Sequence, residues 1–471
     1  MSARVLAGAL LAALAAPAAL AAQDAPRPPA PVALVGATLL DGTGAPPVPD
    51  AVVLVRGGRV ACAGARSACR IPAGVRRLSV AGSWIIPGLI DAHVHLSQTG
   101  WVDGRPDALD LRARYPYERT VADLEARPER FLRAYLCSGV TGVFDVGGYP
   151  WTWALRGRAE RDSLAPHVAA AGPLLSTVPH PILNLGDEQQ IEYVPDDSAA
   201  RAAVREHVAR GTDAIKLWYI VAMGADTTHL KAVVRAIAEE THRLGARLLA
   251  HATGLWEAKD ALRAGADVLV HSVVDKPVDD EFLALARERH AIYIPTLTVY
   301  DGYRQVFVRH FEPHYPLACV DSATLAHARS TDSLPPPTGV TADFAERQRT
   351  RAAHDLQLGE ANLLAVFRAG ITVAMGTDAG NPLTLHGPSV YWEMQAMQEA
   401  GLSPAQVLVT ATRNGALAMG RERDLGTLEP GTLADLVVLG ADPTADIRNV
   451  ETVRWIMRDG ALTTPERVRP R

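Results

Sequence analysis

The stretch Pro87-Gly88-Leu89-Ile90-Asp91-Ala92-His93-Val94-His95 ends an apolar run on two histidines. Residues two apart on an extended strand point to the same side, so the two imidazoles share one face. Burying a polar group at the end of an apolar strand is costly unless the group is hydrogen-bonded or binds a metal. By itself, one His-x-His motif is equally typical of two surface histidines. Its meaning depends on the residues that follow it in the chain.

Four further polar residues close apolar segments in the same way. Lys216 follows Ala-Ile, His251 follows Arg-Leu-Leu-Ala, His271 follows Val-Leu-Val, and Asp378 ends Ile-Thr-Val-Ala-Met-Gly-Thr. Chance is a poor explanation for histidines at two successive strand ends and an aspartate after a third, all behind a His-x-His pair. These residues are therefore interpreted as one ligand set.

Apolar strand candidates alternate with segments of helical periodicity through the central part of the chain, for example helices over 230–244 and 258–263. After the first strand, which ends at His93, the candidates cover 142–145, 167–171, 214–217, 247–251, 267–271, 292–295 and 371–378. Eight strands in this alternation predict an α/β fold, a (β/α)8 TIM-like barrel, whose chemistry lies at the carboxyl ends of its strands. The alternative, an open doubly wound sheet, does not bring ligands from five strands together.

Short β-like segments punctuated by Gly and Pro occupy both ends of the chain, over 32–86 and 421–466. Neither block is large enough to form a good core alone. We therefore expect one small β-sandwich built from both termini, with the barrel inserted between them over 87–420. A helix over 404–419 is expected to return the chain from the barrel to the sandwich.

The chain starts with an arginine-bearing segment followed by an apolar, alanine-rich run, and Ala19-Leu20-Ala21 forms a small-residue cleavage site. This pattern predicts a signal peptide over 1–22, a Pro-rich leader over 23–31, and a secreted or periplasmic protein that does not stay inserted in a membrane. An uncleaved anchor is the alternative, but the run is short and contains Pro17. An oxidising compartment permits a disulfide between Cys62 and Cys69, although two small apolar residues explain them equally well. Cys137 is interpreted as a buried residue, and Cys319 is left unassigned.

A net charge of −5 and a pI of about 6.3 give no reason to expect a nucleic acid or an anionic membrane as partner, which leaves a small-molecule substrate. The chain has only four lysines, Lys216, Lys231, Lys259 and Lys276, beside many arginines. A lysine at the end of a buried strand is notable there, because lysine can lose its charge and arginine cannot.

The chemistry expected of this set is that of a binuclear metal site. Imidazoles suit Zn²⁺, although Mn, Co or Fe can substitute. Burial and positive neighbours lower the pKa of Lys216, and a neutral amine can add CO2 to form a carbamate that bridges two metals. A lysine that reaches solvent at the rim is the alternative. We expect one metal on His93, His95 and Asp378, a second on His251 and His271, and carboxylated Lys216 and a hydroxide between them. Asp378 would act as general base and then acid.

The motifs Pro87–His95 and Gly376-Thr377-Asp378-Ala379-Gly380, with a Gly-Thr-Leu-Glu-Pro-Gly-Thr-Leu-Ala-Asp-Leu run over 426–436, resemble the amidohydrolase superfamily. The resemblance covers essentially all of the chain after residue 22. It is strongest with the imidazolonepropionase-like and prolidase-like members. In the carboxylated-lysine branch, which Lys216 matches, the resemblance implies two zinc ions and hydrolysis of dipeptides such as Xaa-Pro or of N-acyl amino acids. It leaves homo-oligomer formation open.

Three long connections, 96–128, 172–197 and 299–345, follow strands one, three and seven, so we expect them to form the substrate pocket. Within and near them the candidates for substrate contact are Tyr219, His180, Tyr300 and His386, with Trp392 and Arg304 as weaker ones; for each, ordinary packing or surface charge is an alternative of similar weight. The chain departs from the family after Lys216 and at 178–180, where substrate is recognised. The substrate therefore follows less firmly than the catalytic class.

Three other functions compete with amide hydrolysis. A lactonase or other esterase would use the same site. A mononuclear cyclic-amide hydrolase or deaminase would leave Lys216 as a bystander. An exported binding protein on a decayed enzyme fold is disfavoured, because the ligand set is intact.

Overall fold

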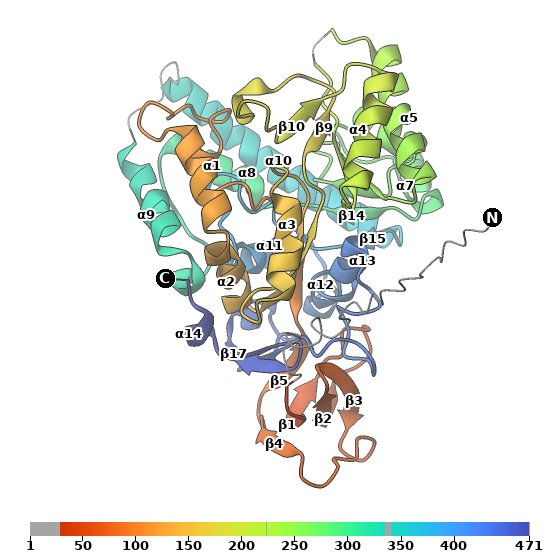
Figure 1. Cartoon of the computed structure of the whole chain (residues 1–471), viewed down its shortest axis with the longest axis vertical. Helices are drawn as coiled ribbons and strands as arrows, with labels where there is room; N and C mark the ends of the chain where they lie inside the picture. Colours follow the sequence, from red (N-terminus) through yellow and green to blue (C-terminus); the bar gives the residue numbers. More distant parts are fainter. Residues whose placement is uncertain (1–28, 223, 335–340, 471) are drawn as a thin grey trace, which may run out of the picture.

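The computed structural model describes residues 29–470 except 223 and 335–340. The predicted signal peptide and most of the Pro-rich leader therefore lie outside the described residues. The chain forms a large α/β part and a smaller β part, which lies at one end of the molecule (Figure 1). Among the helices that the structure describes, none combines the length and the apolar composition that a membrane crossing needs.

The large part contains parallel strands in two hydrogen-bonded sheets. One sheet has the order β6-β7-β8, and the other has the order β10-β9-β11-β12-β13-β14-β15. The eight predicted strands are all present, with these bounds: β6 Leu89–Val94, β7 Val140–Asp145, β8 His167–Ala170, β11 Ile215–Trp218, β12 Leu248–His251, β13 Val268–Val270, β14 Ile292–Ile294 and β15 Thr372–Val373.

Backbone hydrogen bonds also connect the two sheets. The Ala92 amide donates to the Met375 carbonyl at 3.0 Å and the Asp378 amide donates to the His93 carbonyl at 2.8 Å, which joins β6 to the segment after β15. On the other side, the Asp213 amide donates to the Ala170 carbonyl at 3.1 Å, between β8 and the residues before β11. The ends of β6 and β15 therefore lie side by side, and so do their ligand residues.

The segment 172–197, expected as a long loop, contains two further strands, β9 Leu174–Ser176 and β10 Ile191–Tyr193. Strand β9 pairs with β11 in parallel, and β10 pairs with β9. The expectation of a loop was wrong because the strands are only three residues long and their apolar residues are few. They extend the second sheet beside the strand that carries Lys216.

Helices cover the parallel sheets (Figure 1). Their bounds are α1 Tyr117–Ala126, α2 Glu129–Cys137, α3 Thr152–Glu160, α4 Asp197–Ala209, α5 Thr227–Arg243, α6 Leu255–Ala264, α7 Asp280–Glu288, α8 Val299–Val308, α9 Ser322–Ser330, α10 Ala342–Arg368, α11 Ser389–Glu399, α12 Pro404–Thr410, α13 Arg413–Met419 and α14 Pro465–Val468. Short 3-10 turns are η1 Val102–Gly104, η2 Pro181–Leu183, η3 Leu317–Cys319, η4 Thr331–Ser333 and η5 Ile447–Glu451. The predicted helix over 404–419 is interrupted, since Thr412 has φ −128° and ψ −91°.

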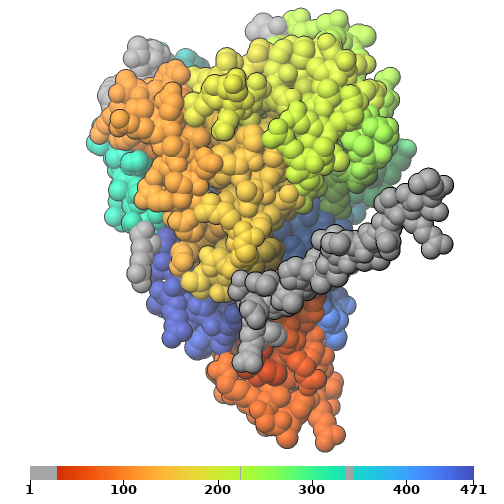
Figure 2. Space-filling view, viewed as in Figure 1, coloured from red at the N-terminus to blue at the C-terminus, as the bar shows by residue number. Residues whose placement is uncertain are grey.

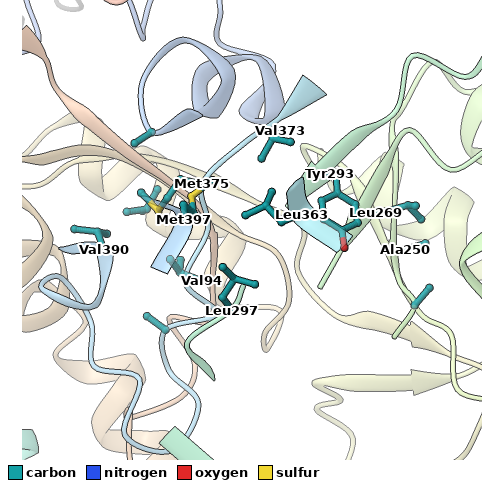
Figure 3. Packing of buried hydrophobic residues seen from close by; sticks show 14 of the residues in the cluster. Val94, Ala250, Leu269, Tyr293, Leu297, Leu363, Val373, Met375, Val390 and Met397 are labelled. Carbon is teal, nitrogen blue, oxygen red and sulfur yellow. The ribbon is translucent and has the colours of Figure 1, made fainter. Parts of the chain in front are cut away.

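The main core lies between the sheets and these helices. Figure 3 shows part of it, where Val94 of β6, Met375 and Leu297 belong to the same apolar cluster as Met397 of α11. All four side chains are buried. The apolar runs of the strands therefore fix the helices around the sheet, and the polar strand ends are left for another use.

The small part combines strands from both ends of the chain, in the order β18-β17-β16-β5-β1-β2-β3 with β4 on β1. Their bounds are β1 Val32–Leu39, β2 Val48–Arg56, β3 Arg59–Ala65, β4 Arg76–Ser79, β5 Trp84–Pro87, β16 Leu436–Leu439, β17 Val453–Arg458 and β18 Ala461–Thr463. In Figure 2 the first of these strands form a narrow lobe beside the C-terminal segments.

The β-sandwich expected from both termini stays a prediction; its eight strands, from both ends of the chain, belong to one hydrogen-bonded sheet. Strand β1 pairs with β4 through residues 32–35 and with β5 through residues 38 and 39. Gly36 lies between these pairings with φ +92°, a conformation that strongly favours glycine. The bend at Gly36 lets one strand pair with two others along the same edge.

All four cysteines form disulfides. Cys62 pairs with Cys69, so the disulfide reading holds and the alternative of two small apolar residues does not. Cys137 pairs with Cys319 across 182 residues of sequence. The interpretation of Cys137 as merely buried was therefore incomplete, because its partner comes from a distant segment that no local pattern indicates.

Candidate metal centre

Six side chains converge where parallel strands end. We call them the strand-end cluster; its members are His93, His95, Lys216, His251, His271 and Asp378. His93 belongs to β6, Lys216 to β11 and His251 to β12, whereas the other three lie just beyond their strands. His251 is partly exposed and the remaining five are buried. The fold thus brings together every residue that the sequence predicts as a metal ligand.

Distances within the strand-end cluster are those of groups that share a small volume. Asp378 Oδ1 lies 3.2 Å from His93 Nε2 and 3.0 Å from His95 Nε2. Asp378 Oδ2 lies 3.8 Å from His271 Nδ1. The ring centroids of His93 and His271 are 4.8 Å apart, and those of His251 and His271 are 4.5 Å apart. Potential ligand atoms of His93, His271 and Asp378 all lie within 4.8 Å of one another.

The backbone at these strand ends adopts conformations that L-residues rarely take. His271 has φ +75°, Asp378 has φ +62° and Thr296, which follows β14, has φ +44°. Such conformations cost about 1–3 kcal/mol each and concentrate at functional sites. Gly376 has no room for a side chain, since a Cβ there would lie 2.7 Å from the Cβ of His93. The chain is held so that Asp378 faces the two histidines of β6.

Burial and mutual charge shift the protonation of the strand-end cluster. Burial, with the positive charge of Lys216 as the second cause, lowers the pKa of His93 and of His251 to about 3. Burial also lowers the pKa of Lys216 to about 7. For Asp378 burial raises the pKa, but the neighbouring histidines outweigh it and hold the pKa well below its usual range. Neutral imidazoles and an ionised carboxylate are the forms that bind metals.

Several polar atoms of the strand-end cluster lack a hydrogen-bond partner among the described residues. They are both ring nitrogens of His93, Asp378 Oδ1 and Lys216 Nζ, and all are buried. Leaving such groups unpaired costs about 1–3 kcal/mol each. Other contacts orient the rings: His95 Nδ1 lies 2.6 Å from the Gly147 carbonyl oxygen, and His271 Nδ1 lies 2.8 Å from Thr296 Oγ1. The donor set therefore fits a divalent metal, which would bind Asp378 Oδ1 and one ring nitrogen of His93.

Asp91 supports the site through hydrogen bonds to Thr377 and His93. It was not singled out as functional in the sequence analysis. It is buried in β6 and accepts hydrogen bonds from the Thr377 amide at 3.0 Å and the Thr377 hydroxyl at 2.6 Å. A third donor is the amide of His93, at 3.3 Å. Burial raises the pKa of Asp91 to about 7. The sequence did contain a signal for this role, because Asp91 is an acidic residue inside the apolar run Leu-Ile-Asp-Ala.

A cavity of about 330 Å³ opens onto the strand-end cluster. It is lined by His95, Gln98, Arg105, Leu174, Leu183, Gln190, Ile191, Lys216, Trp218, His251, Thr253, His271, Val299, Tyr300, Tyr303, Arg304, Phe307, Gln348, Arg351, Ala352, Asp355, Asp378 and Asn381. All three long connections contribute to this lining, as the sequence predicts.

Two of the candidate substrate residues, Tyr300 and Arg304, line the cavity. Tyr219 does not: its hydroxyl donates to Asp260 Oδ2 at 2.8 Å, so the expectation that it contacts substrate is corrected in favour of its neighbour Trp218. Residues two apart on a strand point to the same side, so Trp218 faces the cavity together with Lys216, and this alternation was the available signal in the sequence.

The remaining candidates are also held elsewhere. His180 lies 3.4 Å from Asp107 and packs edge-on against Trp218, outside the lining. His386 lies behind the site, between the Tyr135 hydroxyl at 2.9 Å and the Gln98 carbonyl oxygen at 2.9 Å. Trp392 stacks on His314. These side chains find partners within the fold and are not part of the cavity lining.

Sequence reasoning missed the polar groups that line the cavity from distant segments. Arg105 pairs with Asp107 at 2.7 Å and contacts Asn381, whose side chain also accepts from the Tyr303 hydroxyl at 2.8 Å. Asp355 reaches the cavity from α10. Only the position of Arg105 and Tyr303 after strands one and seven pointed to them.

Comparison with known proteins agrees with this geometry. The Amidohydrolase family matches residues 84–462. An imidazolonepropionase of Streptomyces coelicolor is 28% identical over 409 residues, which cover 84% of this chain and 86% of that protein. A solved Xaa-Pro dipeptidase with bound methionine has a TM-score of 0.71 at 22% identity, covering 92% of this chain and 100% of that one. A solved structure of a putative prolidase from Bifidobacterium longum has a TM-score of 0.67 at 25% identity, covering 92% and 94%.

These matches extend over most of the chain, and the family match includes the parallel strands and, from the small β part, β5, β16 and β17. They agree with a buried donor set of histidines and an aspartate, which is built for a metal. The chain belongs to the amidohydrolase family, is of the imidazolonepropionase and prolidase type, and is a metal-dependent hydrolase of carbon–nitrogen bonds.

Proposed function

We propose that the protein is a binuclear, zinc-dependent amidohydrolase that cleaves the amide bond of a small substrate, either a dipeptide such as Xaa-Pro or an N-acyl amino acid. One observation carries the proposal. The Lys216 amine is buried, has no hydrogen-bond partner among the described residues, and lies close enough to His251 for its charge to lower the pKa of that ring. A bystander lysine would extend its amine to solvent.

Lys216 fits the role of a carboxylated bridging ligand. Burial lowers its pKa to about 7, so a large share of the amine is neutral and able to add CO2 at neutral pH. The product carbamate is an anion with two oxygens, which suits a position between two cations. His93, His95 and Asp378 would hold one metal, and His251 and His271 would hold the other.

When bound, the metals would supply an activated water and polarise the scissile carbonyl. The chain's own contribution is to position and transfer protons. Asp378 Oδ1 contacts His93 and His95, whereas Asp378 Oδ2 does not. Asp378 Oδ2 would therefore accept the proton of the attacking water and return it to the leaving nitrogen. The apolar lining from Leu174, Ile191 and Phe307 would exclude bulk water.

We also propose that the eight predicted strands close into a barrel. The hydrogen bonds between β6 and the segment after β15, and between Asp213 and Ala170, support closure. Export to the periplasm or the medium, directed by residues 1–22, is supported by the two disulfides, since such bonds persist in oxidising compartments.

A mononuclear cyclic-amide hydrolase is the second candidate. It is favoured by the tight group of His93, His271 and Asp378, which combines residues that the binuclear scheme assigns to different metals. The imidazolonepropionase at 28% identity points the same way. The two candidates differ in what they require of Lys216.

Metal stoichiometry distinguishes them. We expect two equivalents of zinc per chain by elemental analysis when the protein is purified with bicarbonate. Lys216→Ala should reduce this to one or fewer, with at least a 100-fold loss of dipeptide turnover, about 2.7 kcal/mol. Lys276→Ala, an exposed lysine, is the matched control and should change neither quantity. One equivalent in the wild type, unchanged by Lys216→Ala, would establish the mononuclear alternative.

A further inference from the structure

A buried carboxylate that the proposed reaction does not use lines the same cavity as Asp378. It belongs to Asp355 on α10, and the residue is only 6% exposed. Among the described residues, Asp355 makes only two long side-chain contacts, with Arg351 Nε at 3.4 Å and with His354 Nδ1 at 3.3 Å. The Arg351 side chain is 74% exposed and the His354 side chain is 62% exposed. Contacts of that length to solvent-exposed groups contribute little. The cavity therefore holds a carboxylate whose charge is poorly compensated.

A second group without a partner lines the same cavity. The hydroxyl of Tyr300, from α8, is buried and has no hydrogen-bond partner among the described residues. The charges of Asp355 and of Asp378 both add to burial in raising the pKa of Tyr300, so this phenol lies within electrostatic reach of both carboxylates. Helices α8 and α10 pack against each other, so the two side chains come from neighbouring elements of the cavity wall.

The cationic side chains of the cavity wall are engaged elsewhere. Arg105 forms a salt bridge with Asp107 at 2.7 Å, and Arg304 pairs with Asp301 and, at 3.6 Å, with Glu312. The third, Arg351, is the exposed side chain that touches Asp355 loosely. A cation that enters with the substrate would therefore find Asp355 available.

We propose that Asp355 and Tyr300 bind a protonated amine of the substrate. An ammonium group donates up to three hydrogen bonds, and a carboxylate and a phenol oxygen are both acceptors. This inference rests on the proposed amide hydrolysis and selects between its two substrate classes: dipeptides with a free amino group are favoured over N-acyl amino acids. The lining by Leu174, Leu183 and Ile191 accommodates the apolar remainder of the substrate.

A binding measurement tests the site without turnover. Titration calorimetry compares hexylamine with hexanol on the purified protein; we expect the wild type to bind the amine about 10- to 100-fold more tightly, as for a charge-assisted hydrogen bond. Asp355→Asn should abolish this preference, and Tyr300→Phe should reduce it about 3- to 10-fold. Glu346→Gln removes a charge from an exposed site on the same helix and should leave the preference unchanged.

Absence of the preference in the wild type, or its persistence in Asp355→Asn, would overturn the proposal. The second result would place the amine on the metals instead. Because no reaction is involved, failure here is distinct from failure of the proposed function, which metal content and dipeptide turnover report.

Kinetics give an independent reading. A dipeptide such as Leu-Pro should be cleaved with kcat/KM about 10- to 100-fold above that of its N-acetyl form, mostly through KM, and Asp355→Asn should bring the two together. Equal rates for both substrates in the wild type, or an equal loss for both in Asp355→Asn, would show that Asp355 has only a structural role.

Discussion

Two polar clusters lie at opposite ends of the parallel strands and are built on different principles. The strand-end cluster occupies the carboxyl ends. The second, which we call the His167 cluster, lies where β8 begins and meets the small β part; it consists of Glu160, His167, Asp435, Arg458 and Asp459. In it, the His167 ring lies 2.8 Å from Glu160, 3.3 Å from Asp435 and 3.5 Å from Asp459. Arg458 pairs with Glu160 at 3.1 Å and with Asp459 at 2.6 Å.

The difference lies in charge balance. Burial alone would lower the pKa of His167, but Asp435 and its fellow carboxylates raise it well above its usual value, so the ring is protonated and paired. In the strand-end cluster, burial and the positive charge of Lys216 keep His93 and His251 neutral. A compensated cluster stabilises the contact between two parts of the chain, whereas an uncompensated one is prepared for a ligand.

The largest expected effect that would test this contrast comes from Asp378→Asn. We expect turnover to fall about 10³- to 10⁴-fold, because the proton acceptor is lost. A variant that unfolds readily while retaining turnover would break the contrast.

An intermediate effect is expected for His167→Gln, on stability and not on turnover. Breaking a buried ion pair costs about 3–5 kcal/mol. Because the folded pKa is raised above the unfolded value of about 6.5, the contribution is complete below pH 6.5 and is lost as the pH rises through the folded pKa. Urea unfolding should therefore show the largest difference near pH 6 and a smaller one at alkaline pH.

His242→Gln, which alters an exposed histidine paired with Asp267 at 3.0 Å, serves as the control and should change stability by less than about 0.5 kcal/mol. A loss of turnover in His167→Gln without a loss of stability would assign this cluster a catalytic role.

The smallest effect is expected for Lys216→Met in metal-free protein kept free of CO2. The folded pKa of Lys216 is lowered to about 7, so between that value and about 10.4 the unfolded chain binds more protons. Wild-type stability should rise with pH over this window, and the variant should lack the rise. At pH 7 the variant should be more stable by about 1–3 kcal/mol, with convergence near pH 10.4.

Lys276→Met, at an exposed position, is the matched control and should leave the pH dependence unchanged. Parallel stability curves for the wild type and Lys216→Met would mean that the Lys216 amine is solvated, and the two clusters would no longer differ in the way described.

The convergence of the strand-end cluster could be predicted because its signal is local. Each of its members ends a short apolar run, and a buried strand that terminates in His, Lys or Asp contradicts its own hydrophobic pattern unless something binds there. The small β part could be anticipated from its Gly and Pro spacing, but not its single sheet, since the pairing of β1 with both β4 and β5 depends on the bend at Gly36.

The lining of the cavity could not be predicted in the same way. Trp218 lines the cavity and Tyr219 does not, because adjacent residues at a strand end point to opposite sides. His180 and His386 are engaged by Asp107, Tyr135 and the Gln98 carbonyl, from other segments.

What the sequence by itself determined is therefore the chemistry: the ligand set, its order along the strands and the family that shares it. What only the tertiary structure decided is the surroundings of that chemistry: the Cys137–Cys319 disulfide, the added strands β9 and β10, and the meeting of Asp355 with Tyr300 in one cavity. The physical reason is how far apart in the sequence the interacting residues lie. Strand ends are specified by neighbours in sequence, whereas the direction and partners of a side chain depend on packing between segments distant in the chain.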